Sequence, residues 1–111
     1  MQRRQSGNGW KIMAKKYRVG IIGSGKIAQT QYIPALLRDE RAEIVALCDI
    51  SYSLALKCAA IFGLPEFLAV SSLEELIRRK PQVVFILTHD HEEIARRLID
   101  EGISQIGRAH V

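Results

Sequence analysis

The stretch Val19-Gly-Ile-Ile-Gly-Ser-Gly-Lys-Ile-Ala28 joins an apolar run to a glycine-rich turn and then to a helical pattern. It predicts a strand, a turn and a helix, with the motif Gly-x-Gly-x-x-Ala at the turn. In this motif Gly23 allows a tight turn and Gly25 lets the backbone approach a pyrophosphate, while the small Ala28 lets the helix pack on the strand. The amino end of the helix then directs its N–H groups and its positive dipole end at the phosphates.

A second apolar run, Ile44 to Cys48, ends in an acidic residue, Asp49. An acid at the end of the second strand accepts hydrogen bonds from the adenosine ribose in dinucleotide-binding folds. Ile50 follows, with no adjacent Arg or Lys to hold a 2′-phosphate, so the sequence favours NAD; Ser51 and Lys57 leave NADP open. A purely structural role for Asp49, as a turn or capping acid, also stays open.

A different phosphate-binding motif competes for the same residues. Gly20 to Lys26 also fits Gly-x-x-x-x-Gly-Lys, the phosphate loop of nucleotide triphosphatases. That loop needs Ser or Thr next to hold magnesium, whereas this chain has Ile27, and Gly20 would lie inside the first strand. We therefore disfavour this interpretation and take Lys26 as a solvent-facing or phosphate-neighbouring residue.

The rest of the chain alternates between predicted strands and helices. We expect strands at residues 17–22, 43–49, 67–70 and 82–87, and helices at 26–38, 52–62, 73–80 and 92–101. Pro34 should loosen a turn of the first helix. Ser51 and Ser72 should cap the next two, the second with Glu75 in a capping box. This order predicts an α/β fold, a doubly wound parallel sheet with right-handed crossovers.

Composition excludes some functions. The chain has 111 residues, 48% hydrophobic and 25% charged, as expected of one globular domain, and its apolar runs are too short to span a membrane. The net charge of +4 arises from residues 1–16, which carry five basic residues and no acid. The remainder has a net charge of −1, which disfavours a nucleic-acid surface. Cys48 and Cys58 lie in apolar patterns, typical of buried thiols in a reducing, cytoplasmic compartment.

The segment Thr88-His-Asp-His91 follows the fourth predicted strand, at the edge of the sheet where ligands bind. Two histidines and an acid suggest a metal site. However, His89 and His91 are two residues apart on a loop and have no third clustered ligand. We expect no metal, and we interpret Asp90 and His91 as the start of the next helix.

Together these features resemble the amino-terminal half of the glucose–fructose oxidoreductase/inositol dehydrogenase (Gfo/Idh/MocA) family, over Tyr17 to Gly102. The resemblance rests on Arg18 to Ala28, Tyr32 to Leu36, Ile44 to Asp49, Ala60 to Gly63, Ser72 to Leu76 and Thr88 to Gly102. It implies an NAD(H)- or NADP(H)-binding Rossmann domain of an oxidoreductase. Such an enzyme transfers hydride to or from a sugar- or polyol-like substrate held by a second, α+β domain.

The resemblance also assigns cofactor-binding residues. It implies that the pyrophosphate is held by Gly23, Ser24, Gly25, Lys26 and Ile27, the adenosine ribose by Asp49, and the nicotinamide side by Leu87, Thr88 and His91. Many relatives have a longer loop containing Thr-Pro before the helix-starting histidine, whereas only two residues separate Thr88 from His91 here. The shorter loop changes the contacts that the family pattern implies for Thr88, but it does not change the fold.

No catalytic residue is assigned. The family continues into a strand and Glu-Lys-Pro, whose lysine contacts substrate and nicotinamide, and its second domain supplies a proton-transfer histidine; the 111 residues contain neither. We therefore expect a piece truncated before the second domain, inactive alone and poorly soluble or marginally stable. Its fourth strand should present an unpaired edge where a fifth strand is missing.

We divide the chain into three parts. Residues 1–15 form a disordered basic leader that includes a natural start at Met13, and residues 16–104 form the partial NAD(P)-binding domain. Residues 105–111 form a non-native tail without ordered core contacts, because Ile106 to Val111 matches a reading frame of a common sequencing adapter. A non-catalytic NAD-sensing or regulatory module is the alternative function. The partners expected of the parent protein are a carbohydrate-like small molecule and further copies of itself in a homo-oligomer.

Overall fold

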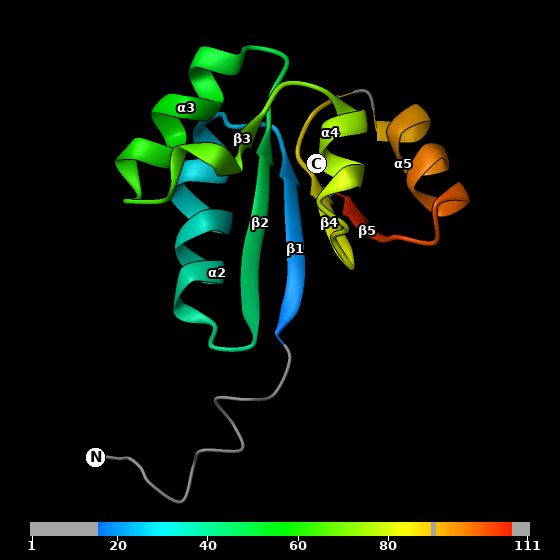
Figure 1. Cartoon of the computed structure of the whole chain (residues 1–111), viewed down its shortest axis with the longest axis horizontal. Helices are drawn as coiled ribbons and strands as arrows, with labels where there is room; N and C mark the ends of the chain where they lie inside the picture. The colour runs from blue at the N-terminus through cyan, green and yellow to red at the C-terminus, as the bar shows by residue number, and fades with distance from the viewer. Residues whose placement is uncertain (1–15, 90, 108–111) are drawn as a thin grey trace, which may run out of the picture.

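The computed structural model describes residues 16–89 and 91–107. Our predictions for the leader, for Asp90 and for residues 108–111 lie outside the described residues. Five parallel strands form one sheet in the order β3-β2-β1-β4-β5, with helices on both faces (Figure 1). The predicted α/β, doubly wound Rossmann fold is confirmed.

The elements agree with the predicted ranges to within a few residues, except in the third strand and at the carboxyl end. The strands are β1 (Tyr17–Ile22), β2 (Ala42–Cys48), β3 (Ala69–Val70), β4 (Val83–Ile86) and β5 (Ser104–Gly107). The helices are the π-helical turn η2 (Ala28–Tyr32), α2 (Ile33–Arg38), α3 (Tyr52–Ile61), the 3₁₀ turn η3 (Glu66–Leu68), α4 (Leu73–Arg78) and α5 (His91–Asp100). Strand β3 is shorter than expected because residues 66–68 form the 3₁₀ turn instead.

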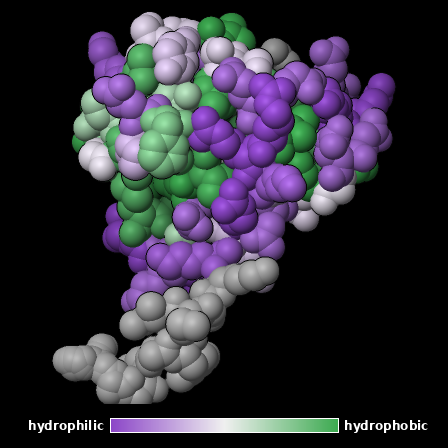
Figure 2. Space-filling model, in the orientation of Figure 1, coloured by the Kyte–Doolittle hydropathy of each residue, from purple (hydrophilic) through white to green (hydrophobic). Residues whose placement is uncertain are grey.

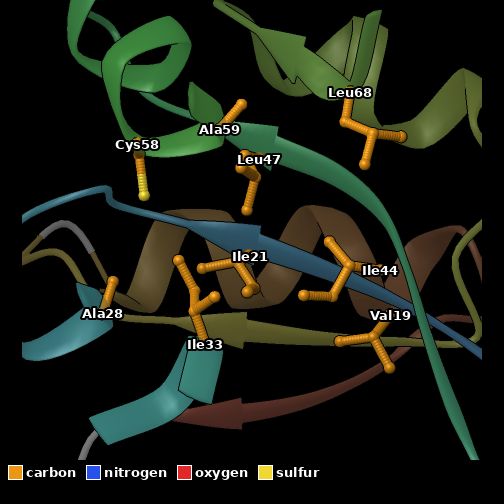
Figure 3. Close-up of a cluster of buried hydrophobic side chains, with 9 residues drawn as sticks. All are labelled: Val19, Ile21, Ala28, Ile33, Ile44, Leu47, Cys58, Ala59 and Leu68. Carbon is orange, nitrogen blue, oxygen red and sulfur yellow. The ribbon is translucent and has the colours of Figure 1, made fainter. Parts of the chain in front are cut away.

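The sheet separates two hydrophobic clusters. On the face covered by α2 and α3, Ile21 of β1 packs with Ile33, Leu47 and Cys58 (Figure 3). On the face covered by α4 and α5 the cluster is formed by Ile22, Ala46, Cys48, Val70, Leu76, Val84, Ile86, Leu98 and Ile103. The central strands are thus apolar on both faces, as expected for a parallel sheet. The outer surface is more hydrophobic on the α2 and α3 side than over α4 and α5 (Figure 2).

The first helix contains the loosened turn that Pro34 predicts. The Ile33 N–H donates to the Ala28 carbonyl, a five-residue step that defines the π-helical turn η2. Proline has no N–H, and its ring would clash with the carbonyl four residues earlier, that of Thr30. The wider turn removes this clash, and the helix then continues as α2.

Two serine caps are also confirmed. Ser51 Oγ accepts from the Leu54 N–H at 3.4 Å, and Ser72 Oγ accepts from the Glu75 N–H at 3.2 Å. The reciprocal bond of the second cap is shifted by one residue, because Glu75 Oε1 accepts from the Ser71 N–H at 3.2 Å. This backbone bond is the main reason why the pKa of Glu75 is lowered.

Helix α4 ends two residues earlier than predicted. Lys80 has a φ of +55°, and the chain turns there into β4. The Arg18 guanidinium of β1 donates to the carbonyls of Arg79 and Lys80. A cation at the carboxyl end of a helix is favourable because the last carbonyls have no partner within the helix. The sequence pattern gave no sign of this contact.

The prediction that the fourth strand has an unpaired edge is wrong. Strand β5 pairs with β4 in parallel, from Val83 opposite Ser104 to Ile86 opposite Gly107. Residues 105–107, which we expected to make no ordered core contacts, are ordered by their pairing with β4, although none of the three is buried. The foreign origin of this segment stays a prediction.

Candidate dinucleotide-binding site

The glycine loop is anchored to the strands on both sides of β1. The Gly23 N–H donates to the Cys48 carbonyl of β2 at 2.7 Å, and the Leu87 N–H donates to the Ile22 carbonyl at 2.9 Å. The loop therefore lies where the strand order reverses, between β1 and β4, at the carboxyl edge of the sheet. In doubly wound sheets this is the position of the ligand crevice.

The two glycines of the motif are required for different reasons. Gly23 has a φ of +105°, and an added Cβ would lie 3.1 Å from Thr88 Cγ2 and 3.4 Å from Leu87 Cβ. The fold itself therefore needs glycine at this position. An added Cβ at Gly25, by contrast, has no heavy atom within 4 Å. The described residues leave the space beside Gly25 open, where the motif predicts a pyrophosphate.

Asp49 contacts the loop directly. Its Oδ2 accepts from the Ser24 N–H at 2.9 Å, and its Oδ1 accepts from the Ser51 N–H at 2.9 Å. The structural role that the sequence left open is thus present. Because an ionised carboxylate has about four acceptor sites, these two bonds leave acceptor capacity for ribose hydroxyls.

Lys26 and Ile27 begin the helix beyond the loop. Lys26 is exposed and Ile27 is partly buried. With Gly25 and Leu87 they contribute to a cavity of about 420 Å³ between the helix and the end of β4. A larger hollow of about 900 Å³ is lined by residues of α2, β2 and η3. We favour the smaller cavity, because it adjoins the glycine loop and the carboxyl edge where such sheets bind ligands.

The end of β4 supplies the remaining predicted residues. Leu87 is half-buried and lies against Gly23, as does the Thr88 side chain. Thr88 Oγ1 is buried without a hydrogen-bond partner among the described residues. The His91 ring lies against β5, since an added Cβ at Gly107 would be 1.7 Å from its Nε2. The structure thus brings Leu87 and Thr88 to the loop and places His91 beside β5.

The cysteines near the site are not nucleophiles at neutral pH. Burial raises the pKa of Cys48 to about 11, and the neighbouring Asp49 carboxylate adds to this shift. Burial is also the main reason why the pKa of Cys58 is raised. Both thiols are free and buried. Cys48 and Cys58 therefore pack as small apolar groups.

Residues 16–89 and 91–107 contain neither a metal-ligand cluster nor a membrane-spanning helix. No three His, Cys, Asp or Glu side chains of these residues lie close enough together to ligate a metal ion. Within the same ranges, no helix has both the length and the apolar character needed to cross a membrane.

Residues 17–107 match the Gfo/Idh/MocA family, described as an oxidoreductase family with an NAD-binding Rossmann fold. The chain belongs to this family. The match covers 91 of the 111 residues and continues to the end of β5. The predicted NAD-binding domain is therefore confirmed, whereas the roles of individual site residues stay predictions. No curated protein sequence matches the chain.

Solved structures show the same domain within longer proteins. A dehydrogenase (MviM) from Clostridium difficile is 27% identical with a TM-score of 0.73, and the match covers 84% of this chain and 30% of that one. An oxidoreductase from Thermotoga maritima is 28% identical with a TM-score of 0.72, covering 84% and 29%. A variant of KijD10, a 3-ketoreductase from Actinomadura kijaniata solved with TDP-benzene and NADP, is 24% identical with a TM-score of 0.75, covering 86% and 30%. The chain thus spans about 30% of the length of each of these relatives.

One side chain that contacts the loop was not predicted. Gln29 Nε2 donates to the Ser24 carbonyl at 2.9 Å. The glycine motif specifies small residues at fixed positions and carries no requirement at position 29. Only the local backbone, with its π-helical turn, shows that this side chain reaches back to the loop.

Proposed function

We propose that this chain binds NAD across the carboxyl edge of its sheet and is the cofactor domain of a hydride-transferring oxidoreductase. The observation that carries the proposal is the open space at Gly25, beside a loop that Asp49 holds from the second strand. Neither feature is needed to fill the protein core. Both are expected where a backbone must approach a pyrophosphate and an acid must meet a ribose.

We assign the pyrophosphate to residues 23–27, at the amino end of the helix, and the adenosine 2′-hydroxyl to Asp49. Leu87, Thr88 and His91 are assigned to the nicotinamide side. Thr88 Oγ1 supports this assignment, because it has no partner among residues 16–89 and 91–107, and a bound ligand would satisfy a buried hydroxyl that is otherwise costly. When bound, the cofactor supplies the hydride or accepts it.

For the parent protein we propose a sugar- or polyol-like substrate oxidised or reduced at a hydroxyl-bearing carbon. KijD10 is described as a 3-ketoreductase and was solved with TDP-benzene and NADP, and this description supports chemistry at a carbon that carries a keto or hydroxyl group. We place the parent protein in the cytoplasm, in keeping with two buried, free cysteines. The 111-residue chain should bind cofactor without turning over a polyol, since it contains no Glu-Lys-Pro.

Cofactor choice tests the proposal. NADH should bind more tightly than NADPH, because Asp49 bonds a 2′-hydroxyl and repels a 2′-phosphate. Asp49→Ala should reduce the difference between the binding free energies of NADH and NADPH by about 1–3 kcal/mol, the usual cost of a lost polar pairing. The affinity for NADH should fall more than the affinity for NADPH. Asp49→Ala also removes the acceptor of the Ser24 N–H.

Fluorescence titration of both nucleotides measures the effect. Asp39→Ala is a matched control, because the Asp39 carboxylate accepts hydrogen bonds from Arg41 and lies in the turn before β2. NADPH binding as tightly as NADH to the unmutated chain would contradict the proposed cofactor choice.

A further inference from the structure

We infer that Gln29 is a positioning residue, which orients the loop amide that faces the cofactor diphosphate. The inference rests on the proposed function and adds a residue that the glycine motif does not contain. It depends on one peptide group, the one that joins Ser24 to Gly25.

The Ser24 residue is held from both sides. Its N–H donates to Asp49 Oδ2 at 2.9 Å, and its carbonyl accepts from Gln29 Nε2 at 2.9 Å. Ser24 is only 2% exposed, although it lies in a loop. Asp49 and Gln29 therefore act as a clamp from two different elements, the end of β2 and the first helix.

The clamp determines the direction of the next amide. In a planar trans peptide the carbonyl and the following N–H point in opposite directions. Gln29 holds the Ser24 carbonyl toward the helix, so the Gly25 N–H points away from it. Gly25 is exposed, and among the described residues beyond its chain neighbours no heavy atom lies within 4 Å of the position that a Cβ would occupy. The Gly25 amide thus points away from the helix, at an exposed residue beside the space that we assign to the pyrophosphate.

The π-helical turn accompanies this arrangement. Gln29 also donates its backbone N–H to the Gly25 carbonyl at 3.1 Å, so it closes the first turn with both backbone and side chain. Thr30 Oγ1 donates to the Lys26 carbonyl at 2.9 Å, which fixes the following peptide. π-turns within α-helices occur frequently at functional sites. Here Pro34, outside the loop, is the sequence feature that explains the turn.

The test replaces Gln29 with Met, which has a similar shape but no N–H donor. Gln82→Met is the matched control, because Gln82 Oε1 accepts from the Arg18 N–H at 2.9 Å near the start of β4. Each variant loses one bond between a side chain and the backbone, but only the first touches the loop. The probes are NADH, which carries a diphosphate, and adenosine, which does not.

Gln29→Met should weaken NADH binding by roughly tenfold, the effect of about 1.4 kcal/mol and within reach of one lost hydrogen bond. Adenosine affinity should not change, and Gln82→Met should leave both affinities unchanged. In the ligand-free chain, hydrogen exchange of the Ser24 amide should be faster in Gln29→Met than in the parent sequence.

Three results would overturn the inference. The first is equal NADH affinity of the two variants, and the second is unchanged Ser24 exchange in Gln29→Met; the third is a uniform loss of affinity. If the unmutated chain fails to bind NADH, the proposed function fails, while the exchange measurement still decides whether the clamp exists. A uniform loss of NADH and adenosine affinity would indicate a general structural role and also overturn the inference.

Discussion

The two sides of the candidate site are held in different ways. On the β1 and β2 side, the backbone of the glycine loop is fixed by hydrogen bonds to Cys48 and Asp49. On the β4 side, Thr88 Oγ1 is buried without a partner among the described residues, and Leu87 is only half-buried. The first side is therefore preformed, whereas the second contains an unmet hydrogen-bonding group.

This difference indicates where binding energy should come from. A preformed loop loses little conformational freedom when a ligand arrives, so it contributes affinity efficiently. A side chain that lacks a partner gains one only when the ligand is present. We therefore expect substitutions on the first side to change affinity or folding strongly, and substitutions on the second side to change them less.

The largest effect is expected at Gly25. A branched side chain in Gly25→Val would occupy the space where the diphosphate approaches the backbone, so NADH binding should be lost. The fold should persist, because nothing within 4 Å opposes a Cβ there. Fluorescence titration and helical circular dichroism measure the two outcomes. A folded variant that binds NADH as tightly as the parent sequence would show that the β1 and β2 side of the site does not bind the cofactor.

Gly23→Ala should instead lower the free energy of unfolding. The φ of +105° is unfavourable for alanine, and its Cβ would crowd Thr88 and Leu87. Backbone strain of this kind costs about 1–3 kcal/mol, measurable by denaturant unfolding. Gly63→Ala is the control, since it has a φ of +67° but open space around its Cβ. Equal losses in both variants would show that packing at Gly23 adds nothing to backbone strain.

The pH dependence of stability tests the burial of Cys48, which lies on the β1 and β2 side of the site. The pKa of Cys48 is about 11 in the folded chain, against an ordinary value of 9.0, so between these values only the unfolded chain loses the proton. The free energy of unfolding should therefore fall as pH rises from 9 to 11, by up to about 1.4 kcal/mol per pH unit for this thiol. Below pH 9 this contribution is constant. Cys48→Ala should flatten the decline, and an identical decline in the variant would contradict the assignment.

The smallest effects are expected at Thr88, where one substitution should change the stability of the ligand-free chain and the affinity for NADH in opposite directions. Thr88→Val keeps the shape but removes a buried hydroxyl that has no partner among the described residues. The ligand-free chain should gain up to about 1 kcal/mol of stability, while NADH affinity should fall. Thermal unfolding and titration measure the two signs. Unchanged affinity would show that the hydroxyl does not face the cofactor.

The sequence predicted what depends on local pattern. The glycine motif, the alternation of strands and helices up to β4, the caps at Ser51 and Ser72 and the loosened turn before Pro34 all follow from short-range rules. Strand β5 was not predicted because Ser104 to Gly107 has little apolar pattern. These residues form a strand through their pairing with β4, a long-range contact that no local pattern contains. The contacts of Arg18 and Gln29 were missed because each depends on which carbonyl the folded backbone brings within reach.

The π-helical turn has a consequence for chain length. A π-turn spans one residue more than an α-turn, so η2 accommodates one extra residue between the glycine loop and Ile33. Deleting one residue of η2 while replacing Pro34 would convert the turn to α-helix and keep both ends of the helix in place. We therefore expect that η2 can lose one residue other than Ala28 and Gln29, together with the replacement of Pro34, without a change in the dinucleotide site or the core.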